Sequence, residues 1–395
     1  MEVNELKTAV SREVEANKDR LNELSLKIHA NPELGFHEVK AAEWLTAFLE
    51  ENSFSVERGI CELPTAFRAS YGQGKPVIGL VAEYDALPGL GHACGHNLIC
   101  MMAVGAAIAS KLVVDRGKKG TISVVGAPAE EIWGGKAIMA DRGGFDHLDT
   151  AMMVHPGTAN AVTTHGLAAW PLNVEFFGKS AHAAAKPEEG INALEAMLLS
   201  FTAINSLRQH IRSTARVHGV ITDGGQAVNA VPAHAAGSFL VRAEDMKYLE
   251  ELKQRVLNCF IGAATATGAR LEFKWGEGYY APFLNNMTMA RLFQRNMQSL
   301  GRTVRLARPG KSYGSTDMGN VSQIVPGIHP SVAIAPKKVL GHSPEMAVAA
   351  ASEAGLKGLI DGAKALAMTA VDLFTSEETL SQVKAEFQAA KKREK

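Results

Sequence analysis

Short apolar runs with glycine or proline close by constrain the fold of this chain more than any other feature of its sequence. Four such runs occupy residues 76–82, 121–127, 150–154 and 332–335. Uninterrupted apolar runs of this length are typical of strands that lie buried in a parallel sheet. Helical stretches around residues 97–114 and 136–142 separate the first three runs. This alternation predicts an α/β domain in which a mostly parallel sheet is flanked by helices.

Helices are also predicted towards both ends of the chain. The first 28 residues carry a partial apolar stripe, which predicts a single opening helix that stops before Pro32. Further helices are predicted at about residues 38–52, 287–300, 353–373 and 377–395.

The sequence pattern changes at about Ala168, where apolar and polar residues begin to alternate. Two long amphipathic helices are expected in this region, at about residues 190–211 and 244–267. A β-α-β-β-α-β order fits a two-layer, ferredoxin-like unit. We therefore predict an inserted α+β domain over residues 168–283, within one discontinuous domain formed by residues 1–167 and 284–395.

Composition and charge exclude several classes of protein. Lys plus Arg (41) equals Asp plus Glu (41), and this zero net charge argues against a nucleic-acid partner. The longest strictly apolar run, residues 98–109, is 12 residues long, whereas a membrane span needs about 18. The four cysteines show no regular spacing, and the N-terminus lacks the pattern of a secretory signal. We therefore expect a cytoplasmic protein with no membrane partner.

Unusual polar residues follow the predicted core strands. The segment 83–97 comes after the first strand, Glu130 and Glu131 after the second, and His155 after the third. His342 lies in the loop beyond the run at 332–335. Open α/β sheets place their ligand crevices at the carboxyl ends of the strands, so these residues are expected to meet there.

The donor types in these clusters suit a transition metal. The candidate ligands are one thiolate, three imidazoles and one carboxylate, from Cys94, His96, Glu131, His155 and His342. Such a set binds Zn²⁺ or Mn²⁺, and it also accepts Co²⁺ or Ni²⁺. Taken singly, each histidine is more often a surface or core residue, and a lone cysteine is more often a small buried hydrophobe. Five ligands exceed one tetrahedral site and favour two ions about 3.5–4 Å apart.

The adjacent carboxylates Glu130 and Glu131 suggest two different roles in one site. Neighbouring residues of an extended backbone point to opposite sides, so Glu131 can bind metal while Glu130 faces a substrate. A free carboxylate beside an activated water acts as a general base. The alternative interpretation is a solvated acidic loop.

Three weaker signals lie further along the chain. His182 stands among small residues, and Asn229 stands in a glycine-rich segment, where an ordinary turn is the simpler interpretation. Gly314, Ser315 and Thr316 offer hydroxyl and backbone N–H groups to an anion, or they cap a helix.

Five motifs together resemble those of one known family. They occupy residues 29–35, 83–97, 128–131, 179–182 and 314–317. In this order they resemble the metallopeptidase-20 family of dinuclear amidohydrolases, which includes aminoacylase and carboxypeptidase relatives. The motif that ends in Cys94-Gly95-His96-Asn97 is the most specific of them. The similarity is to the hippurate and indoleacetyl-amino-acid hydrolase branch, and within it to aminobenzoyl-glutamate hydrolase and aminoacylase-1-like dipeptidases.

The resemblance implies a role for each candidate residue. It implies that Cys94 bridges two metal ions held with His96, Glu131, His155 and His342, and that Glu130 is the catalytic base. It implies that the inserted domain forms a homodimer, and that His182 stabilises the oxyanion, in many relatives within the partner subunit's site. Asn229 would help to hold the substrate.

Two positions depart from the family pattern. Asn97 stands where many relatives have aspartate, and residues 273–286 lack the arginine that many relatives use for the substrate carboxylate. Arg242 and the loop at Gly314, Ser315 and Thr316 are the candidate replacements.

The expected function is hydrolysis of an amide bond in small N-acyl amino acids or dipeptides by a metal-bridging water, with Glu130 as the general base. One alternative is an amidase with Cys94 as the nucleophile, activated by His96 or His155. Another is a non-catalytic metal-binding protein with the same fold. The acyl group, the physiological metal and the subunit in which His182 acts are left open by the sequence.

Overall fold

The computed structural model describes residues 2–276, 278–306 and 314–394, and the chain divides into two compact units. The first unit takes in the chain up to His165, a segment that begins at Phe283, and the chain from Asp317 on. The second unit takes in Gly166–Pro282 and a short segment that ends at Thr316. Ser315 and Thr316 thus belong to the second unit rather than to the discontinuous domain in which they were predicted.

The first unit is built on a six-stranded sheet with the order β1-β2-β4-β3-β5-β11. Its strands are β1 (Ser55–Arg58), β2 (Phe67–Gln73), β3 (Val77–Glu83), β4 (Gly120–Ala127), β5 (Thr150–Met152) and β11 (Gly327–Ile328). Strands β4, β3, β5 and β11 pair in parallel, and β1 and β2 add an antiparallel edge. The predicted α/β class with a mostly parallel sheet is therefore confirmed.

Several strands differ from the sequence prediction. Strands β1 and β2 were not predicted, because their exposed and half-exposed residues break any continuous apolar run. The run near Val332 was expected in the core sheet, which is wrong. It forms β12 (Ser331–Ala333), which pairs in parallel with β6 (His155–Gly157) in a separate two-stranded sheet. The edge of the core sheet next to β5 is formed by β11, whose two residues are too few to give a sequence pattern.

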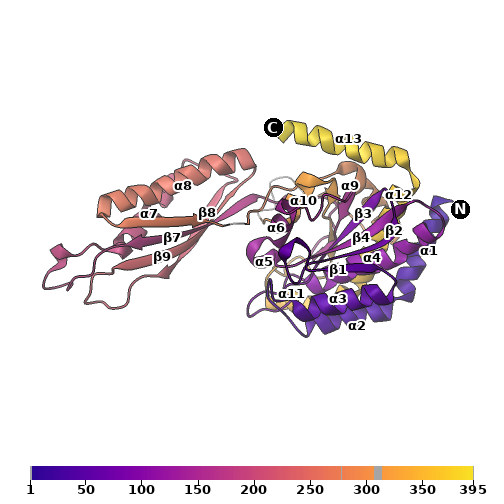
Figure 1. The fold of residues 1–395 in the computed structure, drawn as a ribbon, viewed down its shortest axis with the longest axis horizontal. Helices are drawn as coiled ribbons and strands as arrows, with labels where there is room; N and C mark the ends of the chain where they lie inside the picture. Colours follow the sequence, from indigo (N-terminus) through magenta and orange to yellow (C-terminus); the bar gives the residue numbers. More distant parts are fainter. Residues whose placement is uncertain (1, 277, 307–313, 395) are drawn as a thin grey trace. The chain divides into compact units, whose positions relative to one another are not determined.

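Helices pack around this sheet (Figure 1). They are α1 (Val3–Ala16), α2 (Lys18–His29), α3 (Val39–Glu51), α4 (His96–Asp115), α5 (Glu130–Trp133), α6 (Gly135–Asp141), α9 (Met287–Ser299), α10 (Met318–Ile324), α11 (Pro344–Ala350), α12 (Glu353–Thr375) and α13 (Glu377–Glu394). The prediction of one opening helix is wrong, because the chain breaks at Asn17 between α1 and α2. The Asn17 side-chain amide donates to the backbone carbonyl and the carboxylate of Glu13, each at 3.0 Å, and so competes with helical hydrogen bonding.

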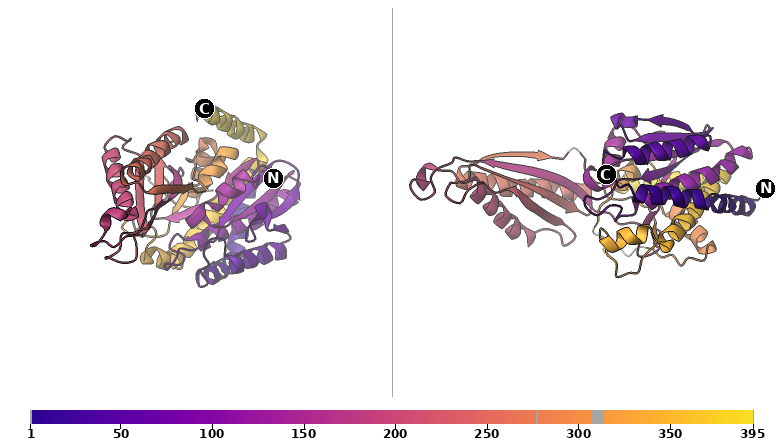
Figure 2. Two further views of the ribbon diagram at one scale, coloured as in Figure 1. Left: turned by 60° about the vertical axis from the view of Figure 1, so that its left-hand side comes forward. Right: turned by 90° about the horizontal axis from the view of Figure 1, so that it is seen from below.

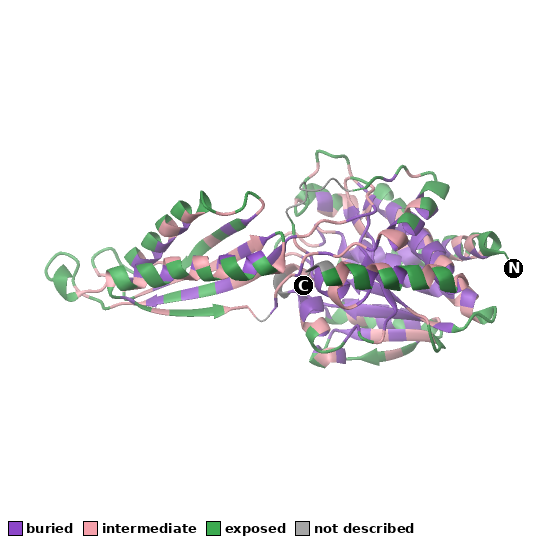
Figure 3. Cartoon of the chain, turned by 90° about the horizontal axis from the view of Figure 1, so that it is seen from above, coloured by how far each residue is buried: buried purple, intermediate pink, exposed green. Residues whose placement is uncertain are grey.

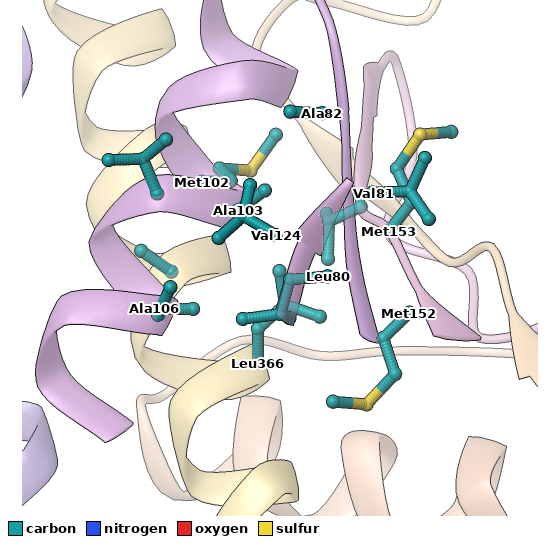
Figure 4. Packing of buried hydrophobic residues seen from close by; sticks show 14 of the residues in the cluster. Leu80, Val81, Ala82, Met102, Ala103, Ala106, Val124, Met152, Met153 and Leu366 are labelled. Carbon is teal, nitrogen blue, oxygen red and sulfur yellow. The ribbon is translucent and has the colours of Figure 1, made fainter. Parts of the chain in front are cut away.

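The core of the first unit lies where α4 and α12 pack on the sheet. Leu80 and Val124 of the sheet contact the layer formed by Met102, Ala106 and Leu366, and all of them are buried (Figure 4). By length and composition α4 could cross a membrane, but 83% of its apolar window is buried inside the protein. Burial on all sides is typical of the central helix of a globular core.

The second unit is a four-stranded antiparallel sheet with the order β10-β7-β9-β8. Its elements follow the predicted β-α-β-β-α-β order: β7 (Ala168–Phe177), α7 (Ala193–Arg208), β8 (Arg216–Asp223), β9 (His234–Ala243), α8 (Met246–Thr267) and β10 (Arg270–Trp275). Helices α7 and α8 lie together on one face of the sheet (Figures 1 and 2). Buried and partly exposed residues alternate along β9, as expected for a sheet with one covered face (Figure 3).

Candidate metal centre

The five predicted ligands converge in the first unit. Cys94 and His96 follow β3 at the start of α4, Glu131 lies in α5 after β4, His155 begins β6 after β5, and His342 precedes α11. Among the described residues, four groups of three have ligand atoms that all lie within 4.8 Å of one another, and two of these groups consist of the predicted ligands alone. These two groups are Cys94, His96, His155 and Cys94, Glu131, His342. Cys94 is common to both groups, which is the arrangement that two ions with a bridging thiolate need.

Hydrogen bonds fix the orientation of two of the imidazole rings. His96 Nδ1 lies 2.9 Å from Asp85 Oδ1, and His155 Nδ1 lies 2.6 Å from the Pro156 carbonyl oxygen. Because these oxygens only accept, each Nδ1 is the donor, which leaves each Nε2 as the nitrogen available to a metal ion. Metal-ligating histidines are oriented in this way by a carboxylate or a backbone carbonyl.

The donor atoms fit a metal ion. His96 Nε2 lies 3.7 Å from Glu131 Oε1, and both atoms are buried with no hydrogen-bond partner among the described residues. Buried polar atoms normally have a partner, and cations bound at the two groups would satisfy both atoms. His155 Nε2 lies 3.3 Å from Cys94 Sγ. The His342 Nε2 atom lies 3.5 Å from Glu131 Oε2, and its side chain is 53% exposed, which leaves one side of the site open to solvent.

The two adjacent carboxylates do not lie in an extended backbone, so that prediction is wrong. Ala129 adopts a left-handed conformation (φ 57°, ψ 44°), which ends the extended chain of β4 and starts the helical turn α5. The Glu131 N–H then donates to Asp85 Oδ2 at 3.0 Å. Glu130 falls into one group with His96 and Glu131, and into another with Glu83 and Asp317. The two carboxylates therefore lie in a helical turn, and their placement does not come from alternation along a strand.

A buried cation lies beside Glu130. The Lys136 ammonium is 2.6 Å from Glu83 Oε1 and 2.6 Å from Asp317 Oδ1, and all three side chains are buried. Burial raises the pKa of Asp317 to about 6. Burial, followed by repulsion from Glu83 and Asp317, also raises the pKa of Glu130 well above its ordinary value. Lys136 partly offsets this negative charge, because paired buried charges cost far less than unpaired ones.

Sequence reasoning missed four polar residues of this centre. Asp85 and Glu83 lay inside the long motif without an assigned role, and Asp317 lay at the end of a loop interpreted as an anion site or a helix cap. The Asp317 side chain makes no cap and pairs with Lys136. The available signal for Lys136 was its position as a lone charge among small residues after Gly134.

The remaining predicted residues lie in the second unit, in two separate places. His182 Nδ1 accepts from the backbone N–H groups of Ala184 and Ala185 at 3.2 and 3.1 Å, so a neutral ring carries its proton on Nε2. The backbone carbonyl of Asn229 accepts from the N–H of Ala183 at 3.0 Å, which brings Asn229 beside His182.

The second place lies at the other end of β7. Arg242 pairs with Ala169 in the sheet register, and its Nη1 donates to Ser315 Oγ at 2.7 Å. The carbonyl of Gly314 accepts from Leu167 N–H at 2.9 Å, and Thr316 is buried next in the chain. His182, by contrast, follows the far end of β7 at Phe177. The structure thus joins His182 to Asn229 and Arg242 to Ser315, but it separates these two pairs.

Comparisons with known proteins identify related hydrolases. The model of peptidase family M20/M25/M40 matches residues 79–371. The chain is 37% identical over 98% of its length to the Xaa-Arg dipeptidase of Mus musculus, of which it covers 93%. It is also 37% identical over 73% of its length to a p-aminobenzoyl-glutamate hydrolase polypeptide of Escherichia coli (strain K12), of which it covers 64%.

A solved structure shares the fold. The chain is similar to a dinuclear metal binding peptidase from the M20 family of Bacillus subtilis, with a TM-score of 0.69 and 22% sequence identity. The similarity covers 91% of this chain and 99% of the other.

Replacement of Lys136 by methionine should destabilise the metal-free protein in a pH-dependent way. At pH 7 we expect the free energy of unfolding to fall by about 3 kcal/mol or more, because Glu83 and Asp317 lose their buried partner. The folded-state pKa of Asp317, about 6, lies above its ordinary value of 3.8, so the folded state binds more protons than the unfolded state between these values. At pH 5 most Asp317 carboxyls in the folded protein are therefore neutral and need no cationic partner. The loss of unfolding free energy caused by the Lys136 replacement should be smaller at pH 5 than at pH 7.

Urea denaturation of both proteins at the two pH values measures this difference. The double variant Lys136→Met/Asp317→Asn should recover part of the loss at pH 7, since it removes one of the unpaired charges. An equal loss at both pH values would contradict the charge-pairing explanation.

Proposed function

The chain belongs to peptidase family M20/M25/M40, and we propose that it is a metal-dependent hydrolase that cleaves the amide bond of dipeptides or small N-acyl amino acids. The family match and the hydrolase relatives confirm the amide-hydrolysing class predicted from the sequence. One observation carries the proposed mechanism. Cys94 is shared by two groups of ligands, and Glu130 lies beside them as a carboxylate that neither group uses.

We assign the five donors to two divalent ions. Cys94, His96 and His155 would hold one ion, and Cys94, Glu131 and His342 would hold the other. Thiolate, imidazole and carboxylate together favour Zn²⁺ or Mn²⁺, and Co²⁺ or Ni²⁺ suit the same donors. When bound, such a pair supplies Lewis-acid polarisation of a carbonyl group and a water of lowered pKa.

Glu130 would serve as the general base and then as the general acid. Its carboxylate takes a proton from the attacking water and returns it to the amine nitrogen that leaves. The position of Glu130 supports this role, because its carboxylate lies within 4.8 Å of ligand atoms of His96 and Glu131. Ala129, with its left-handed backbone, immediately precedes Glu130, and carboxylate oxygens of Glu83 and Asp317 lie within 4.8 Å of the Glu130 carboxylate on another side.

The substrate class follows from the relatives and from one arginine. The mouse relative is a dipeptidase for Xaa-Arg and the bacterial relative hydrolyses p-aminobenzoyl-glutamate, and both substrate types end in an amino acid with a free carboxylate. Arg242 can pair with such a carboxylate, since its guanidinium is fixed by a neutral hydroxyl rather than by an acid. Ser315, with Gly314 and Thr316 beside it, would complete this contact.

His182 would donate its Nε2 proton to the oxyanion of the tetrahedral intermediate. Its exposed ring and the bonds to Nδ1 support this role, and Asn229 lies next to it for contact with the substrate. Strand β7 spans ten residues, or about 30 Å, between the Arg242 end and the His182 end. We therefore propose that His182 acts in the site of the partner subunit.

We propose that the chain forms a homodimer through residues 168–283. Strand β8 lies at an edge of its sheet, and Val220 and Ile221 on it are 62% and 39% exposed. Leu198 and Leu199 of α7 are exposed as well. An unpaired strand edge with apolar side chains favours pairing with a second chain.

We further propose a cytoplasmic location. The cysteines Cys61, Cys94, Cys100 and Cys259 are all free, which suits a reducing compartment.

The alternative with Cys94 as a nucleophile is less favoured. Burial raises the pKa of Cys94, whereas a nucleophilic thiol needs a lowered pKa. The Cys94 thiol also lies among five candidate ligands, an arrangement that nucleophilic catalysis does not require.

Replacement of Glu130 by glutamine should abolish turnover while the metal content stays unchanged, because the amide cannot take a proton from water. We expect kcat to fall by about 10²-fold or more. Elemental analysis and steady-state kinetics on an Xaa-Arg dipeptide measure the two effects. Unchanged turnover would refute the role of Glu130 as the base. The non-catalytic alternative predicts instead that the wild-type protein binds metal but hydrolyses none of these substrates.

Removal of metal should separate the proposal from the cysteine-nucleophile alternative. Dialysis against a chelator is expected to abolish hydrolysis, and added Zn²⁺ or Mn²⁺ should restore it. The cysteine mechanism predicts instead that activity survives chelation. A screen of dipeptides and N-acyl amino acids with the metal restored then identifies the substrate.

Replacement of His182 by alanine should lower kcat by about 10²-fold and leave the metal content unchanged, because one oxyanion donor is lost. Mixing this variant with the Glu130→Gln variant tests whether His182 acts across subunits. Random mixed dimers contain one intact site if it does, so activity should return to about a quarter of the wild-type value. No recovery would place His182 in the site of its own chain.

A further inference from the structure

The segment from Asn31 to Glu38 takes no part in the proposed chemistry, yet it contacts both loops that carry the metal centre. The carbonyl of Glu33 accepts from the N–H of Ala86 at 2.8 Å, in the loop after β3. Gly35 packs on Ala129, in the loop after β4, so closely that a Cβ at Gly35 would lie 2.9 Å from the Ala129 Cβ. The segment therefore bridges the two loops from outside the ligand set.

Glu38 makes the most direct contact with the turn that carries the two carboxylates. Its side chain is fully buried, although it stands at the N-cap of α3, where a carboxylate usually faces the helix end. The capping contacts come instead from Glu33, whose carboxylate accepts from the N–H groups of Lys40 and Ala41. Glu38 is thereby left to face the interior of the first unit.

Both carboxylate oxygens of Glu38 accept hydrogen bonds in the interior of the first unit. Oε1 accepts from the backbone N–H of Ala129 at 2.7 Å, and Oε2 accepts from the Thr65 hydroxyl at 3.0 Å. Burial raises the pKa of Glu38 to about 7. The contacts are therefore those of a buried hydrogen-bonding group rather than those of a strong ion pair.

Ala129 needs such a contact because its backbone is strained. A left-handed conformation is unfavourable for any residue with a Cβ, and it persists only where surrounding contacts impose it. Ala129 immediately precedes Glu130 and Glu131, so its conformation sets the direction in which both carboxylates leave the chain. Asp85 holds the Glu131 N–H on one side of this turn, and Glu38 holds the Ala129 N–H on the other.

We propose that Glu38 is a positioning residue for the hydrolysis, whose carboxylate keeps Ala129 in the left-handed conformation and so directs Glu130 and Glu131. This inference rests on the proposed function, because it assumes that Glu130 is the base and Glu131 a ligand. Glu38 itself touches neither metal nor substrate.

The test compares Glu38→Ala, Glu38→Gln and the double variant Glu38→Ala/Ala129→Gly. We expect Glu38→Ala to lower kcat by about tenfold or more with KM within about threefold, since a small displacement of a catalytic group costs rate. Glutamine keeps an acceptor for Ala129 N–H and a donor to the Thr65 oxygen, so Glu38→Gln should keep at least about half of the activity. Glycine adopts the left-handed conformation without strain, so the double variant should regain at least about threefold over Glu38→Ala.

Titration of the metal-free protein with Mn²⁺ provides a second readout. Because Glu131 leaves the same turn, Glu38→Ala should weaken metal binding by about threefold or more, and the double variant should restore it. Thr65→Val is the matched control, since it removes the other buried hydrogen bond of Glu38 but leaves the Ala129 contact. It should lower the melting temperature without lowering kcat.

Three results would overturn the inference: wild-type kcat and metal affinity in Glu38→Ala, no rescue by Ala129→Gly, or equal losses in Glu38→Gln and Glu38→Ala. Failure of the proposed function is recognised separately. In that case Glu130→Gln, measured in parallel, would retain its turnover whatever the Glu38 variants do.

Discussion

The Asp85 carboxylate is the contact on which the geometry of the candidate centre depends. One of its oxygens accepts a hydrogen bond from His96 Nδ1 at 2.9 Å, and the other accepts from the backbone N–H of Glu131 at 3.0 Å. His96 begins a helix after β3 and Glu131 lies in a turn after β4, so one carboxylate ties together two loops from neighbouring parallel strands. The parallel sheet brings these loops to the same edge, and Asp85 then fixes the distance between the two donors.

Negative charge in this centre is concentrated and only partly offset. Glu83, Glu130 and Asp317 have oxygens within 4.8 Å of one another, with the Lys136 ammonium between two of them. In this buried region, three carboxylates around one ammonium cannot all stay ionised without further positive charge, which raises the pKa of Glu130 and favours a cation nearby. The zero net charge of the chain does not reveal this, because it averages over the whole surface. Local charge at the strand ends, rather than total charge, explains why this centre suits a divalent metal ion.

The sequence predicted what depends on local pattern and missed what depends on tertiary contact. Continuous apolar runs identified β3, β4 and β5, and residue type identified all five converging donors. The two-residue strand β11 has no pattern of its own, because its pairing with β5 comes from the surrounding fold. Glu130 and Glu131 were predicted in extended chain, since Ala129 before them gives no sign of a left-handed conformation that neighbouring segments impose. Lys136 was missed for the same reason, because a buried lysine is explained only by partners that are distant in sequence.

The register of the second unit bears on how many chains the proposed site needs. Arg242 lies opposite Ala169 at the start of β7, whereas His182 follows the other end of that ten-residue strand, about 30 Å away. A dipeptide is only about 7 Å long when extended. One copy of this unit therefore cannot place Arg242 on the carboxylate and His182 on the scissile carbonyl of the same substrate. If both residues act as proposed, each site needs Arg242 of one chain and His182 of a second, and the proposed dimer is then required for catalysis.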